Sequence, residues 1–347
     1  MDTRKIKVGN LYIGGGSPIT VQSMTNVKTE DYLATKSQIS QLVEEGCDIV
    51  RCTVPTIEAS NNLVKLSREF SIPLVADIHF DHKLAIACAN GGVSKIRINP
   101  SNIGAEYKVA EVCKALKVNG TPVRIGVNGG SLDKDIKEKY GVTAKALVES
   151  ALRQADVLEK YGVSNIVISV KSSNTLVSYE AYTLLSQVCN YPLHLGVTEA
   201  GFGQDALIKS SACMGGLLLN GIGDTIRYSI TGSPIDEVKA GISLLTSLKL
   251  RESGVEIISC PTCGRTNIDV EGIARKLKDH LSKERKKVKI AVMGCIVNGI
   301  GEGEEADFGI AGGKDKSVLF AKRKQIKTVD NEDIIPEMIK LFEEYDG

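Results

Sequence analysis

The sequence of 347 residues has no tryptophan, only four histidines and 5% aromatic residues. It also lacks an excess of charge, because 43 Lys and Arg residues face 42 Asp and Glu residues for a net charge of +1. A near-neutral chain is not expected to bind nucleic acid through bulk electrostatics. No apolar run is long enough to span a bilayer, and the polar start, residues 1–7, leads into no apolar signal segment. These absences predict a cytoplasmic protein that has neither nucleic acid nor a membrane as its partner.

The nine cysteines form an odd set that fits a reducing compartment and metal binding better than a disulfide framework. Six of them lie in apolar-patterned segments, and we expect these to be small core residues: Cys47, Cys52, Cys88, Cys113, Cys189 and Cys213. The other three, Cys260, Cys263 and Cys295, lie near the C-terminal end. They are the candidate metal ligands.

Cys260 and Cys263 are two residues apart, so both thiolates can face one metal centre, and Cys295 follows a predicted strand. Three thiolates are too few for a closed four-thiolate zinc site, and no nearby histidine has zinc-finger spacing. An iron-sulfur cluster also needs four ligands, so one iron would be held by another group. Glycines 299, 301 and 303 could fold the following loop back so that Glu302 supplies an exchangeable oxygen ligand. The alternative is a purely structural metal centre with Glu302 as a solvated charge.

The first 250 residues alternate short β-branched runs with longer helical patterns. The predicted strands are eight: Ile19–Met24, Asp48–Val54, Leu74–Phe80, Lys95–Asn99, Val123–Val127, Asn165–Lys171, Leu193–Thr198 and Asp224–Ile230. Predicted helices between them include Tyr32–Glu45, Ile57–Phe70, Ala144–Tyr161 and Asp236–Leu248. Eight such units predict an α/β fold of the TIM (β/α)₈ barrel type. A doubly wound sheet is the rival, but no Gly-rich phosphate fingerprint follows the first strand.

The pattern changes near Glu252, which predicts a barrel domain over residues 1–252 and a small α+β domain over residues 253–347. For the second domain we expect these elements in order: strand Val255–Ser259, helix Val270–Ser282, strand Val288–Met293, a Gly-rich loop, strand Ser317–Lys322 and helix Glu332–Tyr345. This domain carries the three candidate metal ligands. An amphipathic hairpin around Gly9 and Asn10 precedes the barrel.

Alternation along the strands divides each run into an apolar and a polar face. In Lys95–Asn99, Ile96 and Ile98 oppose Arg97 and Asn99. The polar faces are predicted to point into the barrel, near the ends of the strands, with Arg51 and Thr53, Asp77 and His79, Arg97 and Asn99, Arg124 and Asn128, Ser169 and Lys171, and Arg227 and Ser229. Five cations are then expected to point into one opening of the barrel. The carboxylates expected near them are Asp77 and, after the seventh strand, Glu199.

Buried cations without compensation cost several kcal/mol each. We therefore expect a multiply charged anion, such as a diphosphate, in the barrel mouth, where arginine donates paired hydrogen bonds and lysine adds a point charge. The alternative is a structural ion network that pairs Arg51, Arg97 or Arg227 with Asp77, Glu199 or helix carboxylates.

The same residues resemble a known family. The motifs are Ser259–Arg265 (SCPTCGR), Met293–Gly299 (MGCIVNG), Gly301 with Glu302, and Asp307–Gly313 (DFGIAGG), with barrel motifs RCTVP at Arg51, ADIHF at Asp77, KIRINP at Arg97, RIGVN at Arg124, KSS at Lys171, TEAG at Glu199 and IRYS at Ser229. Over essentially the whole chain, they look like those of 4-hydroxy-3-methylbut-2-enyl diphosphate synthase, an iron-sulfur enzyme of isoprenoid biosynthesis. One position departs, because Ile300 stands where the family usually has proline.

The resemblance implies an oxidoreductase that opens and dehydroxylates 2-C-methyl-D-erythritol 2,4-cyclodiphosphate to 4-hydroxy-3-methylbut-2-enyl diphosphate. It implies a [4Fe-4S] cluster on Cys260, Cys263, Cys295 and Glu302, electrons from flavodoxin or ferredoxin, and a homodimer in which one chain's cluster domain caps its partner's barrel. The implied substrate-binding residues are Arg51, Arg97, Asn99, Arg124, Asn128, Lys171 and Ser229. Glu199 would be the proton source, and Asp77 and His79 would position hydroxyl groups with Asn128.

Two other classes stay open on the residues alone. A non-redox iron-sulfur dehydratase acting on a phosphorylated small molecule would use the open iron as a Lewis acid. An iron-sulfur sensor or electron carrier would need no cationic barrel mouth.

Overall fold

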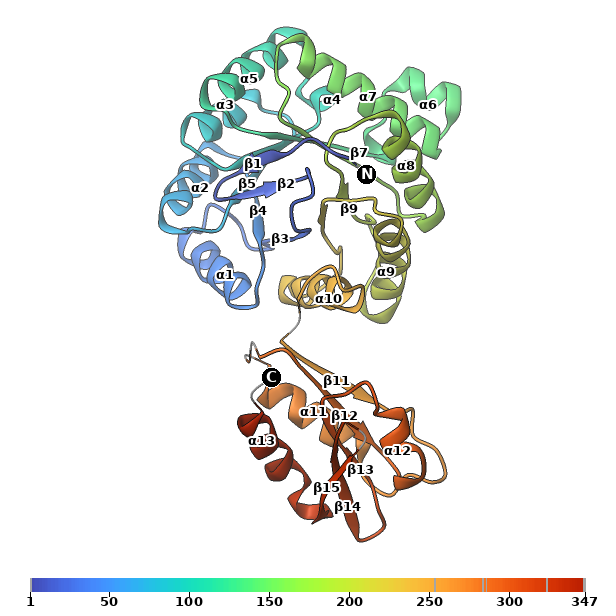
Figure 1. Cartoon of the computed structure of the whole chain (residues 1–347). Coiled ribbons are helices and arrows are strands. Elements are labelled where there is room, and N and C mark those ends of the chain that lie inside the picture. Colours follow the sequence, from blue (N-terminus) through green and yellow to red (C-terminus); the bar gives the residue numbers. More distant parts are fainter. Residues whose placement is uncertain (1, 253, 283, 285, 323, 346–347) are drawn as a thin grey trace. The chain divides into compact units, whose positions relative to one another are not determined.

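The fold was obtained as a computed structural model, which describes residues 2–252, 254–282, 284, 286–322 and 324–345 but not the side chains of Asn298 and Glu302. The chain divides into two compact units, residues 1–251 and residues 252–347 (Figure 1). Among the described residues, none of the helices combines the length and the apolar character that a bilayer span needs.

Parallel strands form the main sheet of the first unit in the order β8-β7-β6-β5-β4-β3-β10-β9. A bridge between Ile168 and Leu193 connects the strands at the two ends of this order, so the sheet is a nearly closed barrel. The strands are β3 Thr20–Met24, β4 Ile49–Thr53, β5 Leu74–Asp77, β6 Lys95–Ile98, β7 Val123–Asn128, β8 Ile166–Lys171, β9 His194–Leu195 and β10 Thr225–Ile226. The predicted TIM barrel is confirmed, although β9 and β10 are much shorter than predicted.

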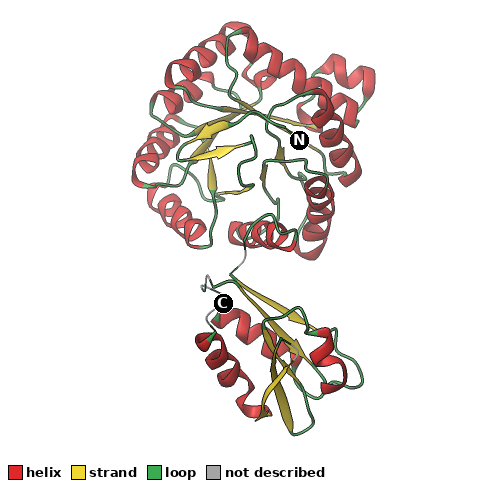
Figure 2. Ribbon diagram, viewed as in Figure 1, coloured by secondary structure: helices red, strands yellow, loops and turns green. Residues whose placement is uncertain are grey.

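Helices surround the barrel (Figure 2). They are α1 Tyr32–Glu44, α2 Ile57–Glu69, α3 His82–Asn90, α4 Pro100–Ile103, α5 Glu106–Asn119, α6 Lys134–Tyr140, α7 Ala144–Lys160, α8 Thr175–Val188, α9 Gly203–Leu219 and α10 Pro234–Ser247. Helix α2 shows how local sequence forms these helices, since the Thr56 hydroxyl caps its first turn by accepting a hydrogen bond from the Ala59 amide. Ala59, Leu63 and Leu66 then form a buried stripe at helical spacing that packs on the barrel.

The predicted N-terminal hairpin is confirmed as β1 Ile6–Val8 and β2 Leu11–Ile13. Its apolar residues Ile6, Val8 and Ile13 pack in one cluster with Ile49 at the start of β4 and with side chains of β5 and β8. The N-terminal end of the barrel is therefore filled with apolar side chains.

The second unit is a five-stranded sheet in the order β11-β12-β13-β14-β15, in which β11, β12 and β13 are parallel and the remaining pairs antiparallel. Its elements are β11 Val255–Ser259, α11 Val270–His280, β12 Val288–Met293, α12 Ile296–Glu302, β13 Phe308–Ala311, β14 Lys316–Ala321, β15 Lys324–Asp330 and α13 Ile334–Glu344. Strands β13 and β15 were not predicted.

The prediction of an irregular Gly-rich loop after Cys295 is wrong over α12. Gly299 in this helix and Gly303 at its C-cap allow close packing, because a Cβ on Gly299 would lie 2.8 Å from the Ala311 Cβ, and one on Gly303 would lie 2.6 Å from the Phe320 ring. The helix thus packs closely on the sheet. Ile300 fits this helix, since it has the backbone N–H that proline would lack.

Candidate active site

The polar strand faces meet inside the barrel. Strand register places Arg97 of β6 beside Asp77 of β5 on one side and Arg124 of β7 on the other, and it places Lys171 of β8 beside Asn128. Residues of the opposite parity, including Ile96 and Ile98, belong to the apolar core that the strands share with the helices. The parity prediction for the interior is therefore correct for these strands.

Asp77 is the centre of one ion cluster. Its carboxylate lies 3.0 Å from Arg97 Nη1, 3.8 Å from Arg51 Nε and 3.5 Å from His79 Nε2. Burial alone would raise the pKa of Asp77, but Arg51, His79 and Arg97 outweigh this effect and hold the pKa well below its usual range. Asp77 is thus a fixed negative charge that orients two arginines, and this part of the alternative ion network is present.

A second carboxylate, Glu237 of α10, was not singled out from the sequence. It is 3% exposed, lies 2.9 Å from Arg227 Nη2 and accepts hydrogen bonds from the Ser23 hydroxyl and the Ile230 amide. Glu237 lies at the start of a predicted amphipathic helix, where a carboxylate is ordinary, so only the folded chain reveals its partner. Burial raises the pKa of Glu237, although Arg227 opposes that rise.

The cations are deeply placed, and two glycines make the space for them. Arg124 is 2% exposed, and its Nη1 donates to Ser169 at 3.0 Å. A Cβ on Gly126 would lie 2.8 Å from Arg97 Nε, and one on Gly196 would lie 2.5 Å from Lys171 Nζ. Gly126 occupies an inward position on its strand, so the alternation of β7 already contained this signal.

Several buried donors in the barrel have no protein partner in the described part of the chain. They are Arg97 Nε, Arg124 Nε, Arg227 Nε and Asn99 Nδ2. An unpaired buried donor costs about 1–3 kcal/mol. A ligand with several acceptor oxygens would satisfy these donors, whereas the protein ion pairs do not.

The remaining predicted residues lie around this group. Asn128 caps a short turn through its bond from the Gly130 amide, and the Ser229 hydroxyl accepts from Arg227 Nη1. The His79 side chain is 45% exposed. Glu199 is exposed, follows β9, and has a left-handed backbone with φ 53°, a conformation that is rare for a residue other than glycine.

In the second unit the cysteines follow the C-terminal ends of two adjacent parallel strands of the sheet. Cys260 follows β11 and Cys295 follows the adjacent parallel strand β12. The Gly294 amide donates to Cys260 Sγ at 3.2 Å, a bond type that tunes thiolates bound to iron. Cys263 is held by a backbone turn with Thr266, and the next residue, Asn267, donates to the Gly294 carbonyl at 2.8 Å. Both segments of the cysteine set thus converge on Gly294.

The three free cysteines supply the thiolate donors that an iron-sulfur cluster takes. Within the described residues, no three Cys, His, Asp or Glu side chains are arranged to hold one metal ion. A [4Fe-4S] cluster is larger and takes each thiolate on a different iron, so its ligands need not meet at one point. The predicted fourth ligand, Glu302, ends α12, and its side chain lies outside the described residues.

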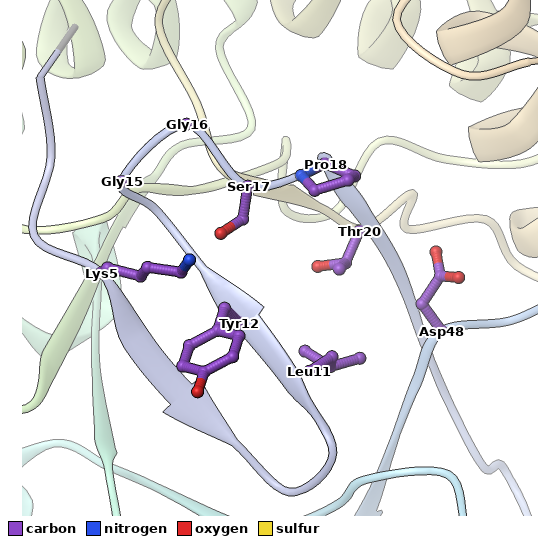
Figure 3. A pocket seen from close by; sticks show the side chains of 9 residues that line it. All are labelled: Lys5, Leu11, Tyr12, Gly15, Gly16, Ser17, Pro18, Thr20 and Asp48. Carbon is purple, nitrogen blue, oxygen red and sulfur yellow. The ribbon is translucent and has the colours of Figure 1, made fainter.

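A cavity of about 470 Å³ in the first unit is lined by none of the inward cations of the barrel (Figure 3). It is bounded by the β1–β2 hairpin and the starts of β3 and β4, with Lys5 over the Tyr12 ring and Asp48 on the opposite side. This is the N-terminal face of the barrel, whereas TIM-barrel chemistry takes place at the C-terminal face. We therefore assign the candidate site to the cation-lined interior.

Fold and site together define a TIM-barrel protein with a cation-lined interior, followed by a small α/β domain with three cysteines in the segments that follow two adjacent parallel strands. A model of the GcpE TIM-barrel domain matches residues 3–242, and a model of the GcpE protein C-terminal domain matches residues 256–344. The chain belongs to the GcpE family.

Curated relatives support this membership over the full length. One from Clostridium perfringens, named 4-hydroxy-3-methylbut-2-en-1-yl diphosphate synthase (flavodoxin), is 52% identical over 343 residues, covering 99% of this chain and 98% of the relative. A second with the same name, from Clostridium tetani, is 53% identical and covers 98% of this chain and 97% of the relative. Among solved structures, a type I 3-dehydroquinate dehydratase from Clostridium difficile has a TM-score of 0.52 at 16% identity, covering 72% of this chain and 98% of that one. That likeness shows the barrel fold alone.

Proposed function

We propose that this enzyme reduces 2-C-methyl-D-erythritol 2,4-cyclodiphosphate to 4-hydroxy-3-methylbut-2-enyl diphosphate, a step of the methylerythritol phosphate route to isoprenoids. The observation that carries the proposal is the set of buried, unpartnered donors in the barrel of a chain that is 52% identical, end to end, to a synthase of that name. The reaction opens the ring, removes one hydroxyl oxygen as water, and consumes two electrons.

Charge balance favours a diphosphate. The upper layer of the barrel interior, above the deeper Lys95, brings together five cations, Arg51, Arg97, Arg124, Lys171 and Arg227. Asp77 and Glu237 offset two of them, which leaves an excess of three positive charges when all are ionised. Burial and the neighbouring arginines lower the pKa of Lys171 well below its usual range. A bound dianion would reverse that penalty, so the site is built to be stable when it is filled.

The roles of the individual residues follow from their positions. The three unpartnered Nε–H groups and Lys171 would hold the two phosphates, with Asn99 Nδ2 as a further donor. Asp77 fixes Arg97 and Arg51, and with the more exposed His79 it would position substrate hydroxyls beside Asn128 and Ser229. Glu199 lies at the exposed end after β9, and we assign it the proton that the departing hydroxyl oxygen takes up to leave as water.

For the second unit we propose a [4Fe-4S] cluster on Cys260, Cys263, Cys295 and Glu302. When bound, the cluster would supply electrons one at a time, together with an iron that can bind a substrate oxygen. The electrons would come from flavodoxin, the donor in the relatives' name, or from ferredoxin. Cys260 Sγ already accepts a backbone hydrogen bond, and hydrogen bonds to the ligating sulfurs help to set the reduction potential of such a cluster. The nine cysteines and this cluster suit the reducing cytoplasm.

We also propose a homodimer in which each barrel mouth receives the cysteine-bearing domain of the partner. Large apolar side chains are exposed where helices begin after barrel strands: Leu33, Ile57, Phe80, Leu176 and Phe202. Ile296 and Val297, directly after Cys295, are exposed as well. Exposed apolar groups around a polar site mark an interaction surface.

Anaerobic turnover of the cyclic diphosphate with reduced flavodoxin tests the proposal. We expect one 4-hydroxy-3-methylbut-2-enyl diphosphate for every two electrons consumed, and Mössbauer spectra that show one iron distinct from the other three. Product formation without any reductant would favour the alternative of a non-redox dehydratase. Absence of turnover in a sample with a full cluster would refute the proposal.

A further inference from the structure

Lys95 is a charged residue to which the proposed reaction gives no role. It lies two residues before Arg97 on β6 and shares its inward face, one layer deeper in the barrel. The side chain is fully buried, and its Nζ has one long contact, 3.5 Å from Gln22 Oε1. Among the described residues Lys95 has no ion-pair partner. A charged ammonium in this position would be poorly compensated.

The groups that face Lys95 are cationic or neutral. Arg51 of β4 and Arg124 of β7 are the charges that repel the Lys95 ammonium most strongly. His194 of β9 has a fully buried imidazole, and the charge of Lys95 opposes its protonation. Burial and these two arginines lower the pKa of Lys95 well below its usual range. Burial and the surrounding cations do the same for the pKa of His194. The nearest carboxylates described, Asp77 and Glu237, bind the arginines of the layer above.

Gln22, the residue that the Lys95 amine contacts, and inward residues of the neighbouring strands β3, β10 and β9 carry unpartnered polar atoms. Within the described residues, Gln22 Nε2, Thr20 Oγ1, Thr225 Oγ1 and both ring nitrogens of His194 lack a hydrogen-bond partner. An amine that changes its protonation state can serve such neighbours either as acceptor or as donor. A lysine fixed in one charge state would be expected to have a carboxylate or a complete hydrogen-bond set.

Resting on the proposed function, we propose that Lys95 is a positioning residue that takes up one proton when the diphosphate binds in the arginine layer above it. The amine nitrogen accepts the proton from solvent, and no electrons are transferred. In the empty barrel a further positive charge repels Arg51 and Arg124. Two bound phosphates offset that repulsion, so the ammonium forms and holds the substrate from below.

The linkage has a defined sign. Between the pKa of Lys95 in the empty barrel and its higher pKa in the loaded barrel, binding consumes a proton and becomes tighter as the pH falls. Each unit by which the pKa rises corresponds to about a tenfold gain in affinity. The cyclic diphosphate ionises far below pH 7 and contributes no proton itself, so the measured proton count belongs to the protein.

Isothermal titration of the oxidised holoenzyme with 2-C-methyl-D-erythritol 2,4-cyclodiphosphate, in two buffers of different ionisation enthalpy, measures this count between pH 6.5 and 9. We expect the wild type to take up as much as about one proton per site. Lys95→Met, a neutral substitution of similar length, should abolish most of the uptake and weaken binding about tenfold for each unit of pKa rise. His194→Gln, Glu237→Gln and Lys171→Met, which remove the other buried groups of the barrel able to gain a proton, should retain it, even where Lys171→Met weakens binding.

Uptake that persists in Lys95→Met but disappears in any of the three control variants would overturn the proposal. If Lys95→Met fails to fold, the wild type and the control variants decide, because either wild-type binding without any proton uptake across this pH range or uptake that disappears in a control variant refutes the role of Lys95. That result leaves the proposed function intact. A wild-type enzyme that does not bind the cyclic diphosphate would instead refute the proposed function and the inference with it.

Discussion

Replacing Gly126 by alanine should disable Arg97 without touching any charged residue. The added Cβ would lie 2.8 Å from Arg97 Nε, 3.0 Å from Nη2 and 3.3 Å from Cζ. The guanidinium must therefore shift, which disturbs its 3.0 Å contact with Asp77 and the direction of its unpartnered Nε–H. Hydrogen bonds to charged groups contribute about 1.5–3 kcal/mol. We expect kcat/KM for the cyclic diphosphate to fall roughly 10- to 150-fold.

Anaerobic steady-state kinetics at saturating reductant measures this loss, and thermal unfolding checks that the fold survives. The new methyl group meets only the end of a flexible side chain, so stability should change by no more than about 1 kcal/mol. Gly215→Ala in α9 is the matched control, since its Cβ would have an ordinary 3.6 Å contact with Leu244. It should keep full activity and gain about 0.5–1 kcal/mol of helix stability.

A double-mutant cycle locates the effect. If the alanine acts through Arg97, then Gly126→Ala should cost nothing further in an Arg97→Ala background, because the side chain that it displaces is already absent. Fully additive losses, or a Gly126→Ala variant within twofold of the wild type, would refute the reasoning.

Three further predictions concern the carboxylates and the cysteines. Asp77→Asn should cost about 3–5 kcal/mol of unfolding free energy at pH 7. Because the folded pKa of Asp77 is depressed, its stabilisation is complete above the unfolded value of about 4 and is lost only as the pH falls through the much lower folded value. Chemical denaturation should therefore show the gap between the two proteins only beginning to narrow at pH 3. Glu237→Gln leaves Arg227 uncompensated, so the Tm of the free protein should be lower than that of the wild type. Inorganic pyrophosphate should raise the Tm of this variant by more than it raises the wild-type Tm. Equal rises in Tm would contradict the charge balance. Cys263→Ser should lose iron and visible absorbance under anaerobic purification. It should keep the pyrophosphate-induced rise in Tm, because Cys263 lies in the other compact unit. Loss of the iron together with loss of that rise in Tm would show that the serine disrupts the barrel.

Glu237 and Gly196 show which part of the site could not be predicted from sequence. The inward cations follow from period-two alternation, which a strand imposes on its neighbours along the chain. Glu237 instead reaches Arg227 and Ser23 from a helix, and that pairing depends on how α10 packs against β3. Gly196 was not recognised, although it lies in the predicted strand Leu193–Thr198, because the sequence does not show that the missing side chain makes room for Lys171.

The sequence by itself determined the eight strand-helix units, the change of pattern near Glu252, the polar faces that point into the barrel, and the three cysteines set apart from the apolar segments. These features are local, since they depend on spacing along a few residues. Tertiary structure alone decided that Asp77 and Glu237 each hold arginines, that Lys95 is buried without an ion pair, and that the glycines after Cys295 form the packed helix α12 instead of a loop. Those outcomes depend on distances between segments far apart in the chain, and the free energy of burying a charge or a methyl group is set only when those segments meet.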